Sequence, residues 1–336
     1  MSWERIRGHE RWIQTFEQVY RQGRLAHSYL FVGLPGIGKR LFARELAKTL
    51  LCEKQNDSSE FQACDQCVSC RMADANTHPD LHIVGRPPQS IEMPIAVMRE
   101  LCRNFTLKPS LGRGKVAILD DADDLNEESA NCFLKTLEEP PPRAVFFLIG
   151  TSRDRQIPTI LSRCQVIRFS PLPAELLSQL LQNHGLDEQA INRLVPMCEG
   201  SVGMALELAD PDLWHFRRTL LKGIVNPKKL DAPALGKVWL GFLEQEGKEN
   251  ALQRRRCASV LKLLIEFLSD ALAHSMEGTP RVTDQDDKKL YQTFTEYHSP
   301  ERMMELAERC MDAEYQLRRY LPVSLIVDGL LDAFCE

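Results

Sequence analysis

The sequence predicts a parallel α/β domain followed by helical domains, and three observations lead to this prediction. Short apolar runs alternate with helical patterns over the first 170 residues, which is typical of a parallel sheet with crossover helices. One of these runs leads into the glycine-rich segment GLPGIGKR, which opens a helical pattern. From residue 171 onward no convincing strand pattern follows, and helical periodicity dominates.

Five segments have the pattern of buried strands, because each is a short apolar run that ends at a turn or at polar residues. Ligands of parallel sheets bind at the carboxyl ends of the strands. Gly33, Asp120 and Thr151 all stand at such ends, so we expect them to lie close together. The five segments are 29–32, DLHIVG (80–85), KVAILDDAD (115–123), AVFFLIGTS (144–152) and CQVIRFSPL (164–172).

Amphipathic helical patterns fill the intervals, for example PIAVMRELCRNFTL and EESANCFLKTLEEP. The predicted organisation is a five-stranded parallel α/β domain over 1–170, with a cysteine module at 52–70. A small helical domain is predicted over 171–209 and a larger one over 210–336.

The composition is that of a globular chain, with 43% hydrophobic and 26% charged residues and a formal net charge of −5. The mild acidity argues against an electrostatic grip on nucleic acid by the chain as a whole. The first residues, MSWERIRGHERW, contain no apolar signal-peptide core, and no run approaches the ~18–20 apolar residues of a membrane span. We therefore expect a cytoplasmic protein without a membrane contact.

The segment GLPGIGKR is close to a phosphate-binding loop, with Gly33, Gly38 and Lys39 in the motif positions and Gly36 between them. Lys39 would reach the β and γ phosphates of ATP or ADP. Arg40 stands where a Ser or Thr hydroxyl normally holds Mg²⁺, and an arginine cannot coordinate a cation. We expect nucleotide and magnesium to bind weakly or not at all. The alternative is a glycine-rich turn that binds no ligand.

A pair of carboxylates follows the third predicted strand, in VAILDDADD. In many ATPases such a strand ends in Asp-Glu, which holds magnesium and activates the attacking water. Asp120 stands at the magnesium position and Asp121 at the position of the base. Because Asp is one methylene shorter than Glu, its reach to the water is reduced, and hydrolysis is expected to be poor. The alternative is a strand that ends in solvated carboxylates.

Four of the eleven cysteines form a cluster in the sequence: Cys52, Cys64, Cys67 and Cys70. Two overlapping C-x-x-C pairs and one earlier cysteine supply four thiolates, which is enough for a closed tetrahedral zinc site of the structural kind. An iron–sulfur cluster is the main alternative. A redox C-x-x-C motif is a weaker one, because it leaves two cysteines unexplained.

An arginine precedes the last predicted strand in TILSRC. Such an arginine is usually a solvated surface charge. Beside a nucleotide-binding sheet, however, Arg163 could stabilise phosphoryl-transfer charge in a neighbouring subunit as an arginine finger.

Together these residues resemble one family, the clamp-loader ATPases of the AAA+ class, from about residue 5 to 208. The resemblance implies an AAA+ module, a helical lid and a helical collar. It also implies a five-subunit ring with delta and gamma/tau subunits, which places a sliding clamp on primed DNA as part of a DNA polymerase holoenzyme. The motifs that carry it are AHSYLFVGLPGIGK, the four cysteines, HPDLHIV, GRGKVAILDDADDLNEESANCFLKTLEEPP and TILSRC.

Within this family the chain is most similar to a stator subunit, which presents its SRC arginine, here Arg163, to the ATP of an adjacent motor subunit. Gly203 in EGSVGMALEL stands where motor subunits carry an arginine that senses the γ phosphate. Arg40, Asp121 and Gly203 together imply little or no intrinsic ATPase activity, while the retained Lys39 leaves nucleotide binding open. The alternatives are a gamma/tau-like motor with its own ATP turnover and a zinc-containing scaffold without a role at DNA.

Overall fold

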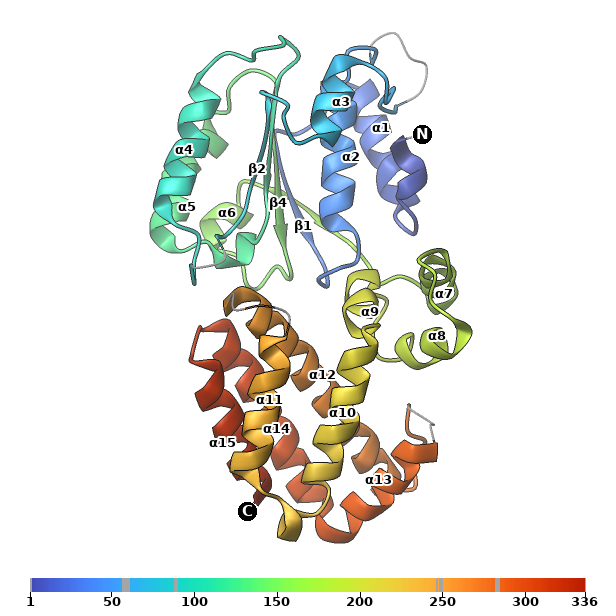
Figure 1. Ribbon diagram of the computed structural model, residues 1–336. Helices are drawn as coiled ribbons and strands as arrows, with labels where there is room; N and C mark the ends of the chain where they lie inside the picture. Colours follow the sequence, from blue (N-terminus) through green and yellow to red (C-terminus); the bar gives the residue numbers. More distant parts are fainter. Residues whose placement is uncertain are drawn as a thin grey trace. The chain divides into compact units, whose positions relative to one another are not determined.

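The structure is a computed structural model that describes residues 2–55, 61–87, 90–245, 247, 250–281 and 285–335. The chain forms two compact units (Figure 1). The first comprises Met1–Gln179 with Gly200–Gly203 and contains the sheet. The second comprises Leu180–Glu199 with Met204–Glu336, and its described residues contain helices and no strand.

The first unit contains the predicted five-stranded parallel sheet, in the order β2-β3-β4-β1-β5. All five predicted strands are therefore confirmed. β1 lies between the middle strand β4 and the edge strand β5, so the segment that follows it leaves the sheet from an inner strand. The strands are β1 (Ser28–Val32), β2 (Leu81–Val84), β3 (Lys115–Leu119), β4 (Ala144–Gly150) and β5 (Gln165–Arg168).

Both faces of this sheet are buried, because side chains alternate between two hydrophobic clusters along each central strand. Phe31 contributes to one cluster and Leu30 to the other. Their neighbours on β4 follow the same alternation, since Tyr29 pairs with Phe147 and Leu30 pairs with Leu148. A continuous apolar run in the sequence is thus the signature of a strand that is covered on both sides.

Helices cover the two faces (Figure 1). α1 and α2 supply Phe16 and Phe42 to one cluster, whereas α4 and α5 supply Leu101 and Phe133 to the other. The helical segments that begin in this unit are η1 (Ser2–Arg5), α1 (Glu10–Arg21), α2 (Lys39–Leu51), α3 (Val68–Asp74), α4 (Ile95–Thr106), η2 (Ala122–Asp124), α5 (Glu127–Glu138), α6 (Pro158–Leu161), α7 (Ala174–Asn183) and α9 (Val202–Leu208).

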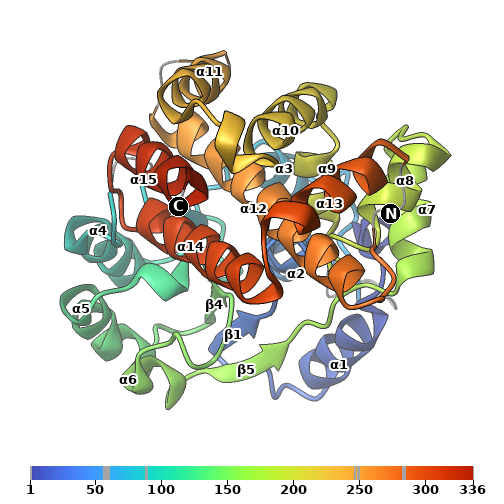
Figure 2. The same ribbon diagram turned by 90° about the horizontal axis from the view of Figure 1, so that it is seen from below.

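The second unit is built around α12, which packs against α10, α11, α13 and α14 (Figure 2). An ion pair at 2.8 Å between Arg217 and Asp287 is buried within it. No helix among the described residues is long and apolar enough to cross a membrane. The division of the helical part at residue 209 stays a prediction. The remaining helices are α8 (Glu188–Leu194), α10 (Pro211–Ile224), η3 (Pro227–Lys229), α11 (Ala232–Glu244), α12 (Asn250–Ser275), α13 (Gln285–Tyr297), α14 (Pro300–Arg318) and α15 (Val323–Cys335).

Candidate functional site

The carboxyl ends of three neighbouring strands meet at the candidate nucleotide site. Gly33 directly follows β1, Asp120 follows β3, and Thr151 follows β4, which lies between them. The Gly33 amide donates a hydrogen bond to the Thr151 carbonyl at 3.1 Å. The structure therefore brings these three sequence-predicted residues to the same edge of the sheet.

The glycine-rich loop has the backbone of a phosphate loop. Gly36 and Gly38 have left-handed φ angles of +74° and +100°, which favour glycine, and Gly38 caps the N-terminus of α2. Lys39, the first residue of α2, is only 6% exposed. Its ammonium donates to the carbonyls of Gly33 and Leu34, both at 2.7 Å. The lysine that would reach phosphate oxygens thus binds the loop itself.

Burial lowers the pKa of Lys39 to about 8, although the negative charges of Asp123 and Asp120 act in the opposite direction. The ammonium form is therefore less stable here than in water. An anion beside this side chain would favour the charged form.

Arg40 forms an ion pair with Asp120, with Nη1 and Oδ2 3.0 Å apart. The residue that replaces the magnesium hydroxyl therefore contacts the carboxylate at the magnesium position. Asp121, at the position of the base, has a left-handed backbone with φ +55°. Burial, followed by the charge of Asp120, raises the pKa of Asp121. Its side chain is one methylene shorter than the Glu usual at this position, which limits its reach to an attacking water.

Thr151 is paired within the protein. Its hydroxyl and its amide both donate to the carboxylate of Asp123, the amide at 2.8 Å. Gln156 donates to the same carboxylate. Sequence reasoning missed Asp123 as a site residue, although it belongs to the same acidic run as Asp120.

The segment Gly200–Gly203 lies directly on the phosphate loop. The Gly203 amide donates to the Gly36 carbonyl at 3.0 Å, and the Ser201 hydroxyl donates to the Pro35 carbonyl at 2.7 Å. A Cβ atom at Gly203 would lie 2.7 Å from the Gly36 Cα. The absence of an arginine at position 203 therefore has a steric reason, because only glycine allows this approach of the two backbones.

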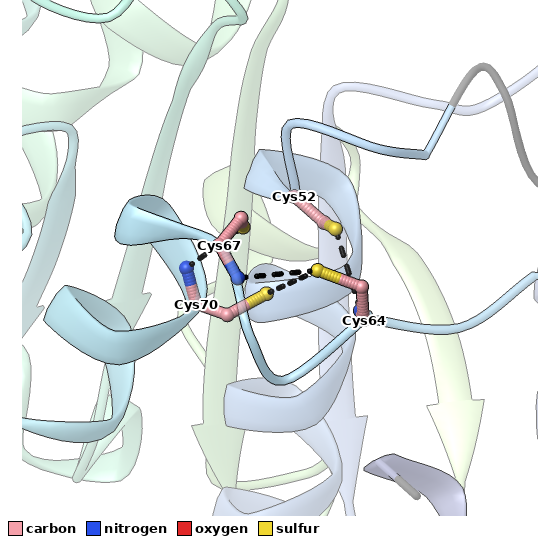
Figure 3. Close-up of side chains that lie close together, drawn as sticks. All are labelled: Cys52, Cys64, Cys67 and Cys70. Atoms are coloured by element: carbon pink, nitrogen blue, oxygen red, sulfur yellow. Dashed lines mark hydrogen bonds between the residues drawn. The ribbon is translucent and has the colours of Figure 1, made fainter.

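The four clustered cysteines form a candidate metal centre beside α2 and α3 (Figure 3). Their ligand atoms all lie within 4.8 Å of one another. In a tetrahedral zinc–thiolate site, bonds of about 2.3 Å place the sulfur atoms roughly 3.8 Å apart. The separation of 4.0 Å between the sulfur atoms of Cys64 and Cys70 is close to that value. The donor set therefore fits a metal ion.

Backbone amides surround the sulfur atoms. The amides of Cys64, Cys67 and Cys70 donate to the sulfur atoms of Cys52, Cys64 and Cys67, at 3.4, 3.4 and 3.3 Å (Figure 3). For Cys64, burial raises the pKa, but hydrogen bonds from backbone amides outweigh it and bring the pKa to about 7. Amides that point at sulfur stabilise the thiolate form, which is the form that binds metals, whereas burial raises the pKa of the Cys52 and Cys70 thiols.

Lys48 connects the cysteine cluster to α2, the helix that follows the phosphate loop. It lies in α2 and forms ion pairs with Glu45, Asp65 and Asp74 at 3.1, 2.8 and 3.1 Å. Burial alone would lower the pKa of Lys48, but its hydrogen bonds with Asp65 and Glu45 raise it overall. The cysteine module is therefore attached to the helix that starts at the phosphate loop.

Arg163 lies beyond α6, at the entrance to β5. Its Nε atom donates to Glu138 at 2.9 Å, and its side chain is 29% exposed. The following residue, Cys164, packs on the cluster of α4 and α5, and burial raises the pKa of its thiol to about 12. The cysteine of the SRC motif is therefore a neutral packing residue that anchors the arginine.

Comparisons with known proteins show which family the chain resembles. The family described as "DNA polymerase III, delta subunit" matches residues 8–173. The chain is 28% identical to the DNA polymerase III subunit delta' of Escherichia coli over 95% of this chain and 93% of that protein. It is 32% identical to the corresponding subunit of Pseudomonas aeruginosa, over 68% of this chain and 70% of that protein.

Two further similarities involve gamma-type proteins. The tau/gamma subunit of Haemophilus influenzae is 31% identical over 65% of this chain, but the match covers 32% of that longer protein. A solved gamma-subunit-related protein of Thermotoga maritima has a TM-score of 0.49 and 18% identity, with 96% of this chain and 98% of that chain covered.

The sheet order, with a phosphate loop after the inner strand β1, defines a P-loop protein of the AAA+ class. The match to the Escherichia coli delta' subunit covers 93% of that protein and the Pseudomonas aeruginosa match covers 70%, whereas the tau/gamma match covers 32% of its relative. The chain belongs to the delta-prime family of DNA polymerase III clamp-loader subunits. The resemblance stated from the motifs is thereby confirmed, and the tau/gamma alternative is disfavoured.

Proposed function

We propose that this chain is the stator of a clamp loader. It assembles with delta and gamma/tau subunits into a five-subunit ring that loads a sliding clamp onto primed DNA. It hydrolyses little or no ATP itself and presents Arg163 to the ATP of a neighbouring subunit. Its family membership supports the assembly, and the cytoplasmic location expected from the sequence belongs to the same proposal.

The ion pair between Arg40 and Asp120 is the observation that carries the non-motor half of this proposal. In a working phosphate loop, a hydroxyl and a carboxylate hold Mg²⁺ between them. Here the guanidinium of Arg40, whose side chain is 58% exposed, pairs with the carboxylate. Lys39 and Thr151 are paired within the protein as well, so the groups that would bind nucleotide are satisfied without it.

Arg163 supports the catalytic half. A guanidinium is planar, permanently charged and suited to two phosphate oxygens at once. Arg163 follows a short helix whose Ile160 is fully buried, so its backbone position is fixed by the core. A partly exposed arginine on a rigid base is what a finger in trans requires.

We assign the cysteine cluster to a structural zinc ion. Four thiolates leave no open coordination position, which is typical of a structural site. Zinc bound by Cys52, Cys64, Cys67 and Cys70 would hold the segment after α2 against α3. Elemental analysis of the purified chain tests this assignment, and iron in place of zinc would indicate an iron–sulfur centre.

The test is an Arg163→Ala variant in the reconstituted five-subunit ring. We expect the ring to assemble normally, while its DNA- and clamp-stimulated ATPase and its clamp loading fall. A finger can contribute ~10³–10⁵ in rate at its own site. The loss for the whole ring is expected to be smaller, because other ATP sites remain. Arg24→Ala, which removes an exposed arginine from the same unit, is the matched control.

An intact ring with unchanged turnover and loading would remove the catalytic half of the proposal. Turnover by the isolated chain near ~1 s⁻¹, abolished by Lys39→Ala, would instead identify the chain as a motor.

A further inference from the structure

We propose that Glu138 is a positioning residue for Arg163. This inference deepens the proposed function and rests on it, since it concerns how the arginine is prepared for a neighbouring phosphate. The two residues come from the two sequence motifs LEEPP and SRC, which the fold brings together.

The contacts of Arg163 occupy most of its hydrogen-bonding capacity. Nε and Nη2 both donate to Oε1 of Glu138, Nε at 2.9 Å. Nη1 donates to the Thr159 carbonyl at 2.9 Å and to the Ser162 hydroxyl at 3.0 Å. A guanidinium has five N–H groups. These contacts within the described residues use four of them and orient the fork, so one N–H of Nη2 is left for a phosphate oxygen, and a second phosphate contact requires one of the present contacts to be exchanged.

Glu138 is itself rigidly placed. It is the last residue of α5, and the preceding Leu137 is 1% exposed in the core. Three prolines, 140–142, follow shortly afterwards and prevent the helix from continuing. A carboxylate at a helix C-terminus is disfavoured by the helix dipole, and the contact with Arg163 offsets this unfavourable interaction. The side chain is 48% exposed, so it is not required to fill the core.

Arg163 is fixed from its own side as well. Its amide donates to the Ile160 carbonyl at 3.0 Å, and β5 begins two residues later. With its backbone held by Ile160 and Cys164, the remaining freedom of Arg163 is that of its long side chain. Glu138 and the Thr159 carbonyl limit that freedom from opposite edges of the fork.

The orientation of Arg163 by Glu138 affects ATP hydrolysis in the neighbouring subunit. A free arginine loses side-chain torsional freedom when it meets a phosphate, and this loss opposes the contact. Orienting the fork beforehand removes part of that penalty, and small misplacements of a catalytic group can lower rates by up to ~10²-fold. Because a finger acts mainly on charge that develops in the transition state, the effect should appear in kcat rather than in KM.

The experiment uses the reconstituted ring with four variants: Glu138→Ala, Glu138→Gln, Arg163→Ala and the double alanine variant. We expect Glu138→Ala to lower the ATPase kcat most of the way to the Arg163→Ala level, with the KM for ATP unchanged. Glu138→Gln keeps an acceptor oxygen, so it should retain most of the rate. The double variant should match Arg163→Ala alone, because Glu138 acts only through the arginine. Glu139→Ala, which removes the adjacent exposed carboxylate, should behave as wild type.

The outcomes separate the two proposals. If Arg163→Ala turns over at the wild-type rate, the finger proposal fails. If Arg163→Ala is slow but Glu138→Ala is at the wild-type rate, the finger stands and the positioning role is wrong. Faster turnover in both Glu138 variants would show that the carboxylate competes with phosphate for the arginine, which also overturns the proposal. A double variant slower than Arg163→Ala would mean that Glu138 acts elsewhere. Melting curves of the isolated variants verify that each chain is folded.

Discussion

The guanidinium of Arg40 lies 3.0 Å from Oδ2 of Asp120, at the place where a phosphate-loop ATPase holds its magnesium ion. Arg40 comes from the first turn of α2 and Asp120 from the end of β3. The positive charge of the Arg40 side chain therefore lies next to the carboxylate that would bind a divalent ion. The loop itself is held by Lys39, whose ammonium donates to the carbonyls of Gly33 and Leu34.

We expect Arg40→Thr to bind Mg²⁺–ATP about tenfold more tightly than the wild type, a difference of ~1.4 kcal/mol. The change supplies a hydroxyl and frees Asp120. Turnover should remain absent, because Asp121 and Gly203 are unchanged. Isothermal titration with and without Mg²⁺ measures the affinity, and Arg44→Thr on the same helix is the control. Equal affinities for all three chains would show that Arg40 does not limit metal binding.

We expect Gly203→Ala to lower the free energy of unfolding by ~1–3 kcal/mol, the usual range for overpacking. The new methyl group would lie 2.7 Å from the Gly36 Cα. A methyl group cannot rotate out of this contact, and the Gly36 Cα is a backbone atom. Urea denaturation measures the change. Gly329→Ala in α15 is the control, because nothing lies within 4 Å of its Cβ position, so that variant should be as stable as the wild type or more stable. A Gly203→Ala chain of wild-type stability would disprove the close approach.

The pKa of Lys39 predicts a pH dependence of stability. The folded-state pKa of about 8 lies below the ordinary value of 10.5, so between these pH values the unfolded chain binds a proton that the folded chain has released. Stability from this group therefore rises with pH in that window. Between pH 7.5 and 10.5, the free energy of unfolding of the wild type should rise by up to about 3 kcal/mol relative to that of Lys39→Met. Each unit by which the two pKa values differ corresponds to ~1.4 kcal/mol. Urea titrations across this range test it, and a constant or falling difference contradicts it.

We expect one zinc ion per chain and its loss in Cys64→Ser. Because metal binding and folding of such a module are coupled, the melting temperature should fall by about 5–10 °C. Clamp loading at a permissive temperature should be nearly normal, since the site is structural. Elemental analysis and thermal melts measure both effects. Cys335→Ser, outside the cluster, should retain metal and stability. A Cys64→Ser chain with a full complement of zinc would refute the ligand set.

Local patterns in the sequence predict the strands, the helices and the kinds of chemistry. Apolar runs such as the one ending at Val32 identified the strands, because a strand buried on both faces needs apolar side chains at every position. The cysteine spacing identified the candidate metal centre, since its ligands lie close together along the chain, between the end of α2 and the first turn of α3. Both signals are local, and local patterns can be read without the fold.

Which residues become partners depends on how the strands and helices pack together. Neither the pairing of Arg40 with Asp120 nor that of Arg163 with Glu138 can be read from the sequence, because each depends on which strands and helices become neighbours. The strand order β2-β3-β4-β1-β5 brings the end of β3 close to the phosphate loop although the two are far apart in the chain. The sequence therefore specified the charges, and the packing of the sheet determined which of them neutralise one another within the protein.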